Sequence, residues 1–364
     1  MEDKKMKYWY WLCNIPELWN QKIRLLLQYF GSPEEVYRCK AEQLALIPGI
    51  TEKNRSDILD SRDGAWKAGI SELDKRKITF LYPEHKDYPK KLKDLTDAPY
   101  SLYVKGTLPD PEKHHVAIVG SRACSAYGKT VTDMLSRELA AYGIGVISGM
   151  ARGIDTVGQR GVLAAGGKTY AVLGSGLDVV YPRENIELYE QILECGGGVI
   201  SEYPLGAQPV QWRFPMRNRI ISGLSDAVLV TEAAERSGSL ITVEFALEQG
   251  KEIFALPGRI TDRLSGGCNR LIQAGAYALT SVQDILNVLK INKKVICENL
   301  SKKDYPLEKE MEVVYSCLSL LPQDIHTIIE ETGMEAEKVV ANLVKLQILG
   351  LVTEPVRSYF ARKG

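Results

Sequence analysis

The chain has 364 residues, of which 45% are hydrophobic, and its 46 basic residues are balanced by 46 acidic ones. This length allows two or three domains of about 100–200 residues each, and the composition is that of an ordinary globular protein with enough apolar residues for a core. The balance of charge excludes recognition of a partner by bulk charge, so the distribution of charge along the chain matters more.

Cysteine and histidine are sparse and scattered. Seven cysteines form no C-x-x-C pair, and there are only four histidines. This pattern is typical of reduced thiols in a cytosol and indicates neither a disulfide framework nor a zinc site. The first residues have too short an apolar run for a signal peptide, and no stretch reaches transmembrane length. We therefore expect a soluble, cytoplasmic protein with no membrane partner and no metal or other cofactor.

Residues 1–75 are expected to form a helical domain. Apolar positions recur at helical spacing in Lys22–Tyr29, Pro33–Cys39 and Glu52–Leu73. Between them, L-A-L-I-P-G-I (44–50) resembles the hairpin of a SAM or helix-hairpin-helix-like module, whose turn amides can hold a DNA phosphate. A plain helix–helix turn in a small bundle explains the same residues, so both interpretations stay open.

Residues 76–290 are expected to form a second domain. Prolines break its first part, which leads into a strand at Leu102–Lys105. From residue 116 onward, apolar runs alternate with helical patterns of about 10–17 residues, which predicts βαβ units and a Rossmann-like parallel sheet. The expected strands are 116–119, 144–147, 169–173, 198–200, 227–230, 252–256 and a short run at Tyr277–Thr280. The expected helices are 126–142, 155–165, 184–195, 239–249 and 281–289.

A polar linker is expected at 291–307, followed by a small domain at 308–364. Three helical patterns, at about 308–320, 323–331 and 335–348, precede a terminal hairpin, which predicts a winged-helix arrangement. Acidic residues outnumber basic ones in this domain by nine to six. A module that holds DNA by itself should neutralise phosphates, so docking to another protein or within the molecule is the favoured role, and DNA contact is the alternative.

The loops of the expected sheet do not fit a nucleotide cofactor. A dinucleotide site needs G-x-G-x-x-G after the first strand and an acidic residue after the second. The first loop reads G-S-R-A-C-S (120–125), with one glycine, and the second strand ends in I-S-G-M (147–150), with no carboxylate. No G-x-x-x-x-G-K-[ST] phosphate loop occurs, which argues against ATP chemistry.

Arginines instead follow almost every strand of the expected sheet. They are Arg122, Arg152, Arg183, Arg236, Arg259 and Arg263, with three more in W-R-F-P-M-R-N-R (212–219). The carboxyl ends of parallel strands share one edge, so these side chains should gather there. A basic groove with interleaved aromatic rings is how single-stranded nucleic acid is held.

The aromatic and hydroxyl residues of these loops add to this prediction. Phe214 lies nearer the arginines of its segment than Trp212 does, so we expect Phe214 to stack on a base, although packing in the core is the alternative for each ring. The segment S-G-S-L-I-T (237–242) reads as a helix start whose hydroxyls and amides, at Ser237, Gly238 and Ser239, are free to take an anion.

Catalytic residues are poorly supported. None of the histidines lies in a glycine turn or beside a candidate nucleophile. Glu232 is expected to orient a neighbouring arginine, and Glu244 to be an ordinary helix residue. We therefore expect a binding protein and not an enzyme.

The ordered motifs of residues 116–282 resemble the DNA processing protein A family (DprA, also called Smf). The residues that carry the resemblance are G-S-R, S-G-M-A-R-G-I-D, V-L-G-S-G-L-D-V-V-Y-P, F-P-M-R-N-R-I-I-S-G-L-S and S-G-S-L-I-T. The resemblance implies a non-catalytic, cytoplasmic protein that binds and protects incoming single-stranded DNA. It also implies a homodimer that loads RecA recombinase during natural transformation.

The resemblance also maps a DNA-binding pocket onto this sequence. Its residues would be Ser121, Arg122, Gly149, Arg152, Lys168, Phe214, Arg217, Asn218 and Arg219. Lys168 is included on the resemblance alone. The alternative is a nucleoside-monophosphate hydrolase of the lysine-decarboxylase-like group, but the segment E-R-S-G-S-L-I-T-V-E (235–244) lacks that group's double-glycine loop.

Overall fold

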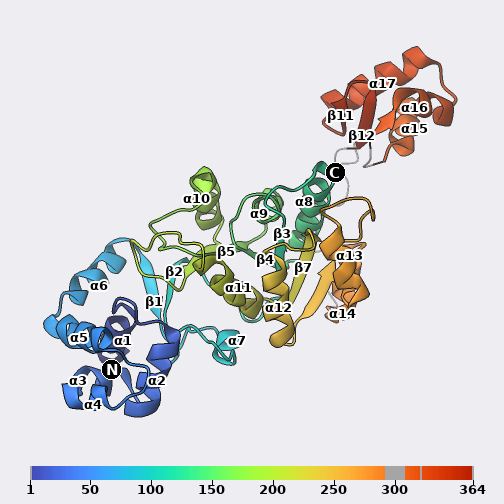
Figure 1. The fold of residues 1–364 in the computed structure, drawn as a ribbon. Coiled ribbons are helices and arrows are strands. Elements are labelled where there is room, and N and C mark those ends of the chain that lie inside the picture. Colours follow the sequence, from blue (N-terminus) through green and yellow to red (C-terminus); the bar gives the residue numbers. More distant parts are fainter. Residues whose placement is uncertain (1, 292–307, 320–321, 363–364) are drawn as a thin grey trace.

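The computed structural model describes residues 2–291, 308–319 and 322–362, so the expected linker lies, apart from Ile291, outside the described residues. The N-terminal part is helical, as predicted (Figure 1). Its elements are α1 Glu2–Cys13, α2 Asn20–Phe30, α3 Pro33–Arg38, α4 Ala41–Ala45, α5 Glu52–Asp60, the 3₁₀ turn Ser61–Asp63 and α6 Trp66–Lys75.

Local signals explain where these helices begin and end. The side chain of Ser32 accepts a hydrogen bond from the N–H of Glu35 at the start of α3, and Thr51 forms a capping box at the start of α5. The helical pattern of residues 52–73 is divided between α5, the 3₁₀ turn and α6, because Gly64 takes φ 94°, a left-handed conformation that ends the 3₁₀ turn.

A nine-stranded sheet forms the middle of the molecule, in the order β1-β2-β6-β5-β4-β3-β7-β8-β9. Its strands are β1 Ile78–Leu81, β2 Leu102–Gly106, β3 His115–Gly120, β4 Gly145–Ser148, β5 Thr169–Leu173, β6 Gly198–Ser201, β7 Ala227–Glu232, β8 Glu252–Ala255 and β9 Tyr277–Ala278. Strands β3 to β9 pair in parallel, and β1 and β2 join the edge at β6 in antiparallel orientation. The predicted α/β class with a mostly parallel sheet is confirmed.

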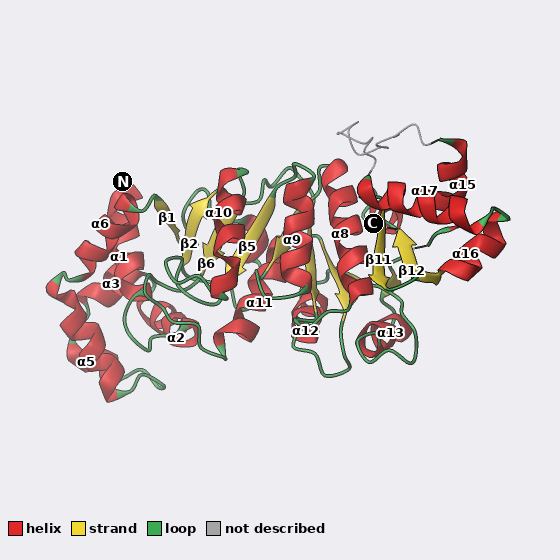
Figure 2. Cartoon of the chain, turned by 90° about the horizontal axis from the view of Figure 1, so that it is seen from above, coloured by secondary structure: helices red, strands yellow, loops and turns green. Residues whose placement is uncertain are grey.

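Helices cover both faces of this sheet (Figure 2). They are α7 Lys90–Lys93, α8 Ala126–Ala141, α9 Ile154–Ala164, the 3₁₀ turn Arg183–Asn185, α10 Ile186–Glu194, α11 Arg213–Leu224, α12 Leu240–Glu248, α13 Gly266–Gln273 and α14 Val282–Val288. One apolar cluster joins the sheet to α8, α9 and α14, and another joins it to α11, α12 and α13. The interpretation of residues 212–219 as an arginine loop is wrong, since most of this segment is the first half of α11.

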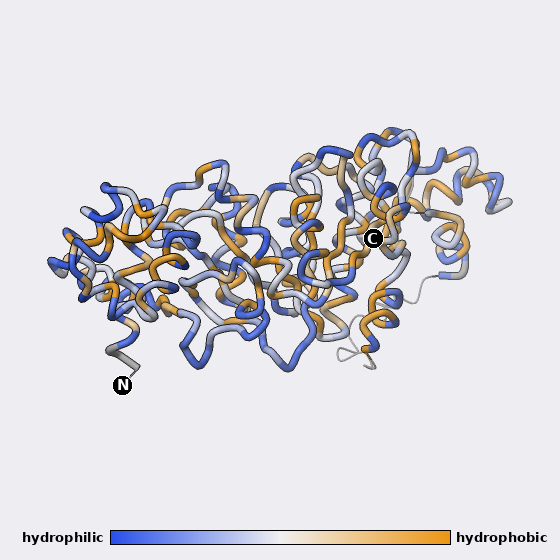
Figure 3. Tube along the Cα trace, turned by 60° about the horizontal axis from the view of Figure 1, so that its bottom comes forward, coloured by the Kyte–Doolittle hydropathy of each residue, from blue (hydrophilic) through white to orange (hydrophobic). Residues whose placement is uncertain are grey.

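The order of the strands fixes where a ligand site can form. The chain adds β4, β5 and β6 on one side of β3 and then crosses over to place β7 on the other side. Loops that leave β3 and β7 therefore diverge, which opens a crevice at the carboxyl ends of these two strands. Strands β3 and β7 are buried and largely apolar, and hydrophobic segments run through the sheet domain (Figure 3).

The C-terminal part has three helices, α15 Lys309–Cys317, α16 Ile325–Thr332 and α17 Ala336–Ile348. A separate antiparallel sheet in the order β10-β12-β11 accompanies them, with β10 Gln323–Asp324, β11 Val352–Val356 and β12 Tyr359–Arg362. Gly333, at φ 63°, ends α16 in the left-handed conformation. In the described part of the chain, no helix has the length and apolarity needed to cross a membrane.

Candidate nucleic-acid interface

A pocket of about 360 Å³ lies in the crevice at the carboxyl ends of β3 and β7. It brings together predicted residues from three segments that are distant in sequence, namely the loop after β3, the first half of α11 and the turn before α12: Ser121, Arg122, Phe214, Arg217, Asn218, Ser237, Gly238 and Ser239. A smaller cavity of about 50 Å³ shares Arg122, Phe214 and Arg217 with this pocket and adds Gly149 and Arg152. We call the two cavities together the strand-end pocket.

Lys168 does not lie in the strand-end pocket, so its assignment is corrected. It immediately precedes β5, at the amino end of that strand, whereas the pocket lies at the carboxyl ends. Its carbonyl oxygen accepts a hydrogen bond from the N–H of Val146, and its side chain is exposed at the opposite edge of the sheet. Its position directly before the expected strand 169–173 already indicated the amino end of that strand, and only the resemblance assigned it to the pocket.

Arg219 is also corrected, because its side chain points away from the strand-end pocket. Its guanidinium donates to Glu202 Oε1 at 2.6 Å and to Asp97 Oδ2 at 3.2 Å, and only 3% of the side chain is exposed. Burial opposes the charged form, but Glu202 and Asp97 more than offset burial and raise the pKa of Arg219 above its ordinary value. Arg219 is therefore a buried, neutralised charge that holds α11 to the β6 loop and the connector.

Arg217 forms the floor of the strand-end pocket. Its Nη1 donates to the carbonyl of Gly149 at 2.9 Å and also to that of Val172. Burial lowers the pKa of Arg217 to about 10, and the carboxylate of Asp155 partly opposes this change. The guanidinium therefore stays charged at neutral pH. A Cβ on Gly149 would lie 2.5 Å from Arg217 Nη1, so a larger residue here would displace the guanidinium.

Asp155 supports the same floor, although the sequence did not single it out. Its Oδ2 accepts hydrogen bonds from the N–H groups of Gly149 and Ala151, at 3.0 and 3.4 Å. Burial raises the pKa of this carboxyl, and the Arg217 charge and these N–H donors act in the opposite direction. Asp155 therefore fixes the loop that follows β4 and offers no free carboxylate to a ligand.

Arg122 is the arginine of the strand-end pocket whose guanidinium is exposed and unpaired among the described residues. The side chain is exposed, and no carboxylate lies within ion-pair distance of it in the described residues. Its guanidinium carbon is 5.8 Å from the centre of the Phe214 ring. The loop that carries it is held by the hydrogen bond from Ile154 N to Ser121 O, at 3.1 Å. A fixed, unpaired guanidinium of this kind suits a phosphate.

Phe214 provides a partly exposed aromatic surface beside Arg122. One edge of the ring lies against Gly174, where an added Cβ would come within 3.0 Å of it. Tyr181, which is 45% exposed, lies 5.5 Å from Phe214 between ring centres. Tyr181 was not chosen from the sequence, although it stands in the V-V-Y-P motif. An aromatic residue in a loop that follows a strand was the signal that could have identified it.

The remaining predicted residues flank this centre. Arg152 makes two hydrogen bonds of 2.8 Å with Glu184, which compensates its charge in the unbound protein. The hydroxyls of Ser237 and Ser239 lie 2.8 Å apart at the start of α12, where the helix dipole is positive. This helix start was predicted from the sequence.

The expectation for Glu232 is wrong, whereas the choice of Phe214 over Trp212 agrees with the lining of the pocket. Glu232 does not orient an arginine: its carboxylate accepts hydrogen bonds from the backbone N–H and hydroxyl of Ser125, and so holds the start of α8. Trp212 lies outside the strand-end pocket and packs against Trp19 and Tyr203. Phe214 is therefore the aromatic residue of segment 212–219 that contributes to this pocket, as predicted.

Together, these features define a class of protein: an α/β fold whose strand-end pocket combines an uncompensated guanidinium, a helix start and stacking rings. A model of the family described as DNA recombination-mediator protein A matches residues 79–290. The chain belongs to this family, and the resemblance stated from the motifs is confirmed.

Relatives match both the core and the whole chain. The chain is 33% identical over 351 residues to Protein Smf of Escherichia coli, which covers 94% of this chain and 92% of the relative. It is 49% identical over 205 residues to the DNA processing protein DprA of Streptococcus pneumoniae. This match covers 55% of this chain and 70% of the relative.

Two solved structures share the fold. The X-ray structure of DprA from Streptococcus pneumoniae superposes with a TM-score of 0.63 at 38% identity, covering 79% of this chain and 96% of that one. The structure of DNA processing protein A from Helicobacter pylori, whose study concerns its single-stranded DNA binding mode, superposes with a TM-score of 0.52 at 32% identity. The match covers 60% of this chain and 98% of that one.

Proposed function

We propose that this protein binds single-stranded DNA in the strand-end pocket. The observation that carries the proposal is the uncompensated Arg122 guanidinium beside the Phe214 and Tyr181 rings. A phosphate would lie on Arg122 and the start of α12, and a base would stack on Phe214. The single-stranded DNA binding mode studied in the Helicobacter pylori relative supports this reading.

We further propose that the protein acts in the cytoplasm as a homodimer and loads RecA recombinase onto the bound strand. The description of the family as recombination mediators supports this role. The bound strand would thereby be protected and handed on during natural transformation. The role involves no chemical step, so the protein would not be an enzyme.

The chemistry of the strand-end pocket supports binding over nucleotide hydrolysis. A hydrolase of the lysine-decarboxylase-like group needs a free glutamate next to the bound phosphate. Among the residues that line the pocket, the carboxylate is that of Asp155, which accepts two backbone N–H groups. Glu232 is bonded to Ser125, and Glu235 is an exposed partner of Arg270 at 3.9 Å.

We propose the same division into functional parts as the sequence suggested: residues 1–75, 76–290, the linker 291–307 and 308–364. The last part would be a winged-helix domain, since its three helices and antiparallel hairpin follow that order. The excess of acidic residues in this part supports docking to protein more than contact with DNA.

The test compares binding with hydrolysis on the full-length protein. Gel shifts with single- and double-stranded oligonucleotides at several salt concentrations would run beside a hydrolysis assay with nucleoside monophosphates. We expect a salt-dependent shift with single strands, a weaker shift with duplex and no hydrolysis. Hydrolysis without a shift of either DNA would overturn the proposal in favour of the hydrolase.

A further inference from the structure

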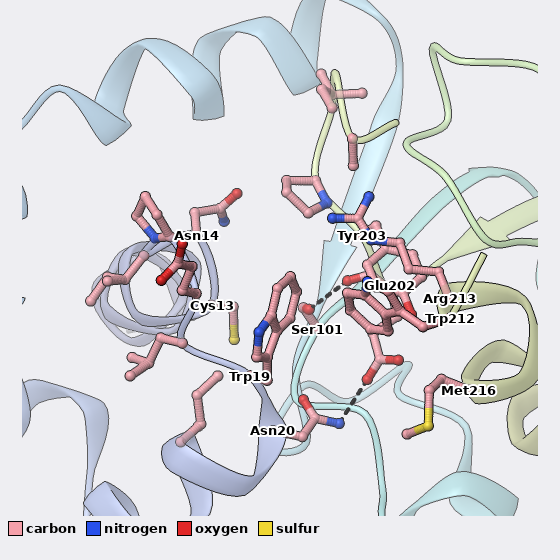
Figure 4. A pocket seen from close by; sticks show the side chains of 18 of the residues that line it. Cys13, Asn14, Trp19, Asn20, Ser101, Glu202, Tyr203, Trp212, Arg213 and Met216 are labelled. Atoms are coloured by element: carbon pink, nitrogen blue, oxygen red, sulfur yellow. Dashed lines mark hydrogen bonds between the residues drawn. The ribbon is translucent and has the colours of Figure 1, made fainter. Parts of the chain in front are cut away.

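A second cavity, of about 500 Å³, lies between the N-terminal helices and the sheet domain (Figure 4). One wall is the turn between α1 and α2, which carries Trp19. The other wall is the loop after β6 and the first turn of α11, which carry Tyr203, Trp212 and Arg213. We call the cavity around these four side chains the aromatic cleft.

Two tryptophans stand half-exposed at this cleft. Trp19 is 44% exposed and Trp212 is 47% exposed, and their ring centres lie 4.9 Å apart in an edge-to-face arrangement of 78°. Behind them, Tyr203 is buried and packs edge-on against Trp212, at 6.2 Å. Adjacent large rings left open to solvent commonly mark an interaction site, because burying them would stabilise a complex.

Arg213 places an uncompensated charge among these rings. Its guanidinium carbon lies 4.6 Å from the Tyr203 ring centre, 5.4 Å from that of Trp212 and 5.7 Å from that of Trp19. Its Nη1 donates to the carbonyl of Gln208 at 2.7 Å, and its Nε is buried without a partner. No ion pair joins Arg213 to a carboxylate within the described ranges.

The other arginine that lines the aromatic cleft, Arg219, is neutralised, and so is Arg24, which shares the carboxylate of Asp97 with it. Arg219 is held by Glu202 and Asp97, and Arg24 pairs with Asp97 at 3.3 Å. Arg213 therefore differs from its neighbours: it is the cation of the cleft that still lacks a negative partner. Charge and rings together fit a nucleotide, which offers a phosphate and an aromatic base.

The aromatic cleft is continuous in the chain with the strand-end pocket. Trp212, Arg213 and Met216 line the cleft, whereas Phe214 and Arg217 line the pocket. The first turns of α11 therefore separate the two cavities, with neighbouring residues facing opposite ways. A single strand that leaves Phe214 over the start of α11 would arrive at Trp212.

We propose that the aromatic cleft is a second subsite for the same single strand of DNA. A base of that strand stacks on one of the two perpendicular rings, Trp212 or Trp19, and contacts the other at its edge, while its phosphate lies on Arg213. This inference rests on the proposed function, since it extends the path of a strand bound in the strand-end pocket. The N-terminal helices thereby contribute directly to DNA binding, through Trp19. The competing explanation is that the two tryptophans only attach these helices to the sheet domain.

The first experiment measures the affinity of the full-length protein for oligo-dT of about six and about twenty nucleotides, by fluorescence anisotropy. We expect Trp212→Leu and Arg213→Gln each to weaken binding of the long strand about tenfold. Binding of the short strand, which fills the strand-end pocket alone, should change less than about twofold. Tyr29→Leu removes another exposed aromatic of the N-terminal helices, outside the cleft, and should change neither affinity.

The outcomes separate the two proposals. A wild-type protein that binds neither strand overturns the proposed function, and this subsite with it. A wild-type protein that binds both, with an unchanged long-strand affinity in Trp212→Leu, overturns the subsite alone. Equal weakening of both strands also overturns the subsite, because Trp212 would then act only by positioning Phe214.

A second measurement does not depend on variants that remove the rings. Bound oligo-dT should quench the intrinsic fluorescence of Trp19 and Trp212, since Trp9 and Trp11 are buried, at 5% and 1% exposure, and the partly exposed Trp66 lies outside the aromatic cleft. The double variant Trp19→Phe, Trp212→Phe keeps aromatic surfaces, so it should bind the long strand within about threefold of wild type but lose most of the quenching. Full quenching in this variant would overturn the proposal.

Discussion

Two arginines on opposite sides of helix α11, Arg122 and Arg219, differ in whether a carboxylate compensates their charge. On the flank toward the strand-end pocket, Arg122 stands exposed over Phe214 without a carboxylate partner among the described residues. On the other flank, Arg219 is buried and held by Glu202 and Asp97. Both arginines follow strands of the same sheet, and both belong to motifs of the family.

This difference shows that an arginine's position after a strand does not by itself assign its role. A guanidinium that already has two carboxylates gains little from a phosphate, because its charge is compensated and its hydrogen bonds are made. An unpaired guanidinium on a fixed loop can give its full charge to a phosphate. We therefore expect a change at the compensated Arg219 to affect stability and a change at the uncompensated Arg122 to affect binding.

The largest effect is expected for Arg219→Ala. Removing this charge leaves Glu202 partly buried without its cation, which should destabilise the fold by about 3 kcal/mol. Urea unfolding measures the change. Arg24→Ala is the matched control, because Arg24 shares Asp97 but is 38% exposed, so it should have a much smaller effect. If Arg219→Ala kept full stability and lost DNA binding, Arg219 would be a binding residue like Arg122, and the contrast between them would be wrong.

A pH effect is expected from His115, at the amino end of β3 and far from the strand-end pocket. Burial, with a smaller contribution from Lys91, lowers the pKa of His115 from 6.5 to about 4. The unfolded chain therefore takes up the proton first as the pH falls, and stability present above pH 6.5 is lost toward pH 4. The loss should reach about 2 kcal/mol at pH 5.

Unfolding of His115→Leu as a function of pH checks this prediction. The variant should lose the part of the acid destabilisation that begins below pH 6.5, and its affinity for single-stranded DNA at neutral pH should be unchanged. His326→Leu, at an exposed position of α16, serves as the control and should keep the wild-type profile. An unaltered profile in His115→Leu would contradict the assignment.

A smaller change in free energy, confined to binding, is expected for Arg122→Ala. The affinity for single-stranded DNA should fall about tenfold, and the slope of log affinity against log salt should flatten by about 0.7, the share of one phosphate. Stability should hold, since the side chain is exposed. Arg160→Ala removes an equally exposed arginine of α9 and should leave both quantities nearly unchanged. Equal effects in the two variants would mean that bulk charge explains binding.

The smallest effect is expected for Glu184→Gln, which releases Arg152 from its exposed ion pair. The freed guanidinium should raise the affinity for single-stranded DNA about two- to threefold at low salt, and the gain should vanish at high salt. Glu187→Gln makes the same change of charge at an exposed position of α10, without releasing an arginine. If both variants gain equally, Arg152 takes no direct part.

The sheet was predictable because its signals are local. Buried parallel strands are continuous apolar runs, and those at residues 116–119, 144–147, 169–173, 198–200, 227–230 and 252–256 all correspond to strands. Helix α11 was missed because its first turns, W-R-F-P-M-R-N-R, alternate rings and charges on both flanks. Such a helix, placed between two cavities, has no single apolar stripe to reveal it.

The sequence predicted most of the residues that line the strand-end pocket, but it did not predict which of their charges are compensated. The topology brings Arg122, Phe214 and Ser237 to one crevice, as parallel strands require. Tyr181 and Asp155 were overlooked, since their roles depend on contacts with Phe214 and with the loop after β4. Arg219 was misplaced because sequence marks a cation but not its partners, whereas Lys168 was assigned on the resemblance alone.

Sequence by itself determined the order of strands and helices, the parallel sheet, the family and the edge at which the arginines gather, because these follow from hydrophobic periodicity and short motifs. Only the tertiary structure decided which of those arginines remain free. Compensation of charge depends on carboxylates far away in the chain: Asp97 is 122 positions from Arg219. Segments so distant meet only when the sheet domain, its connector and helix α11 pack together, and that packing leaves Arg122 and Arg213 without a counter-charge within the described parts of the chain.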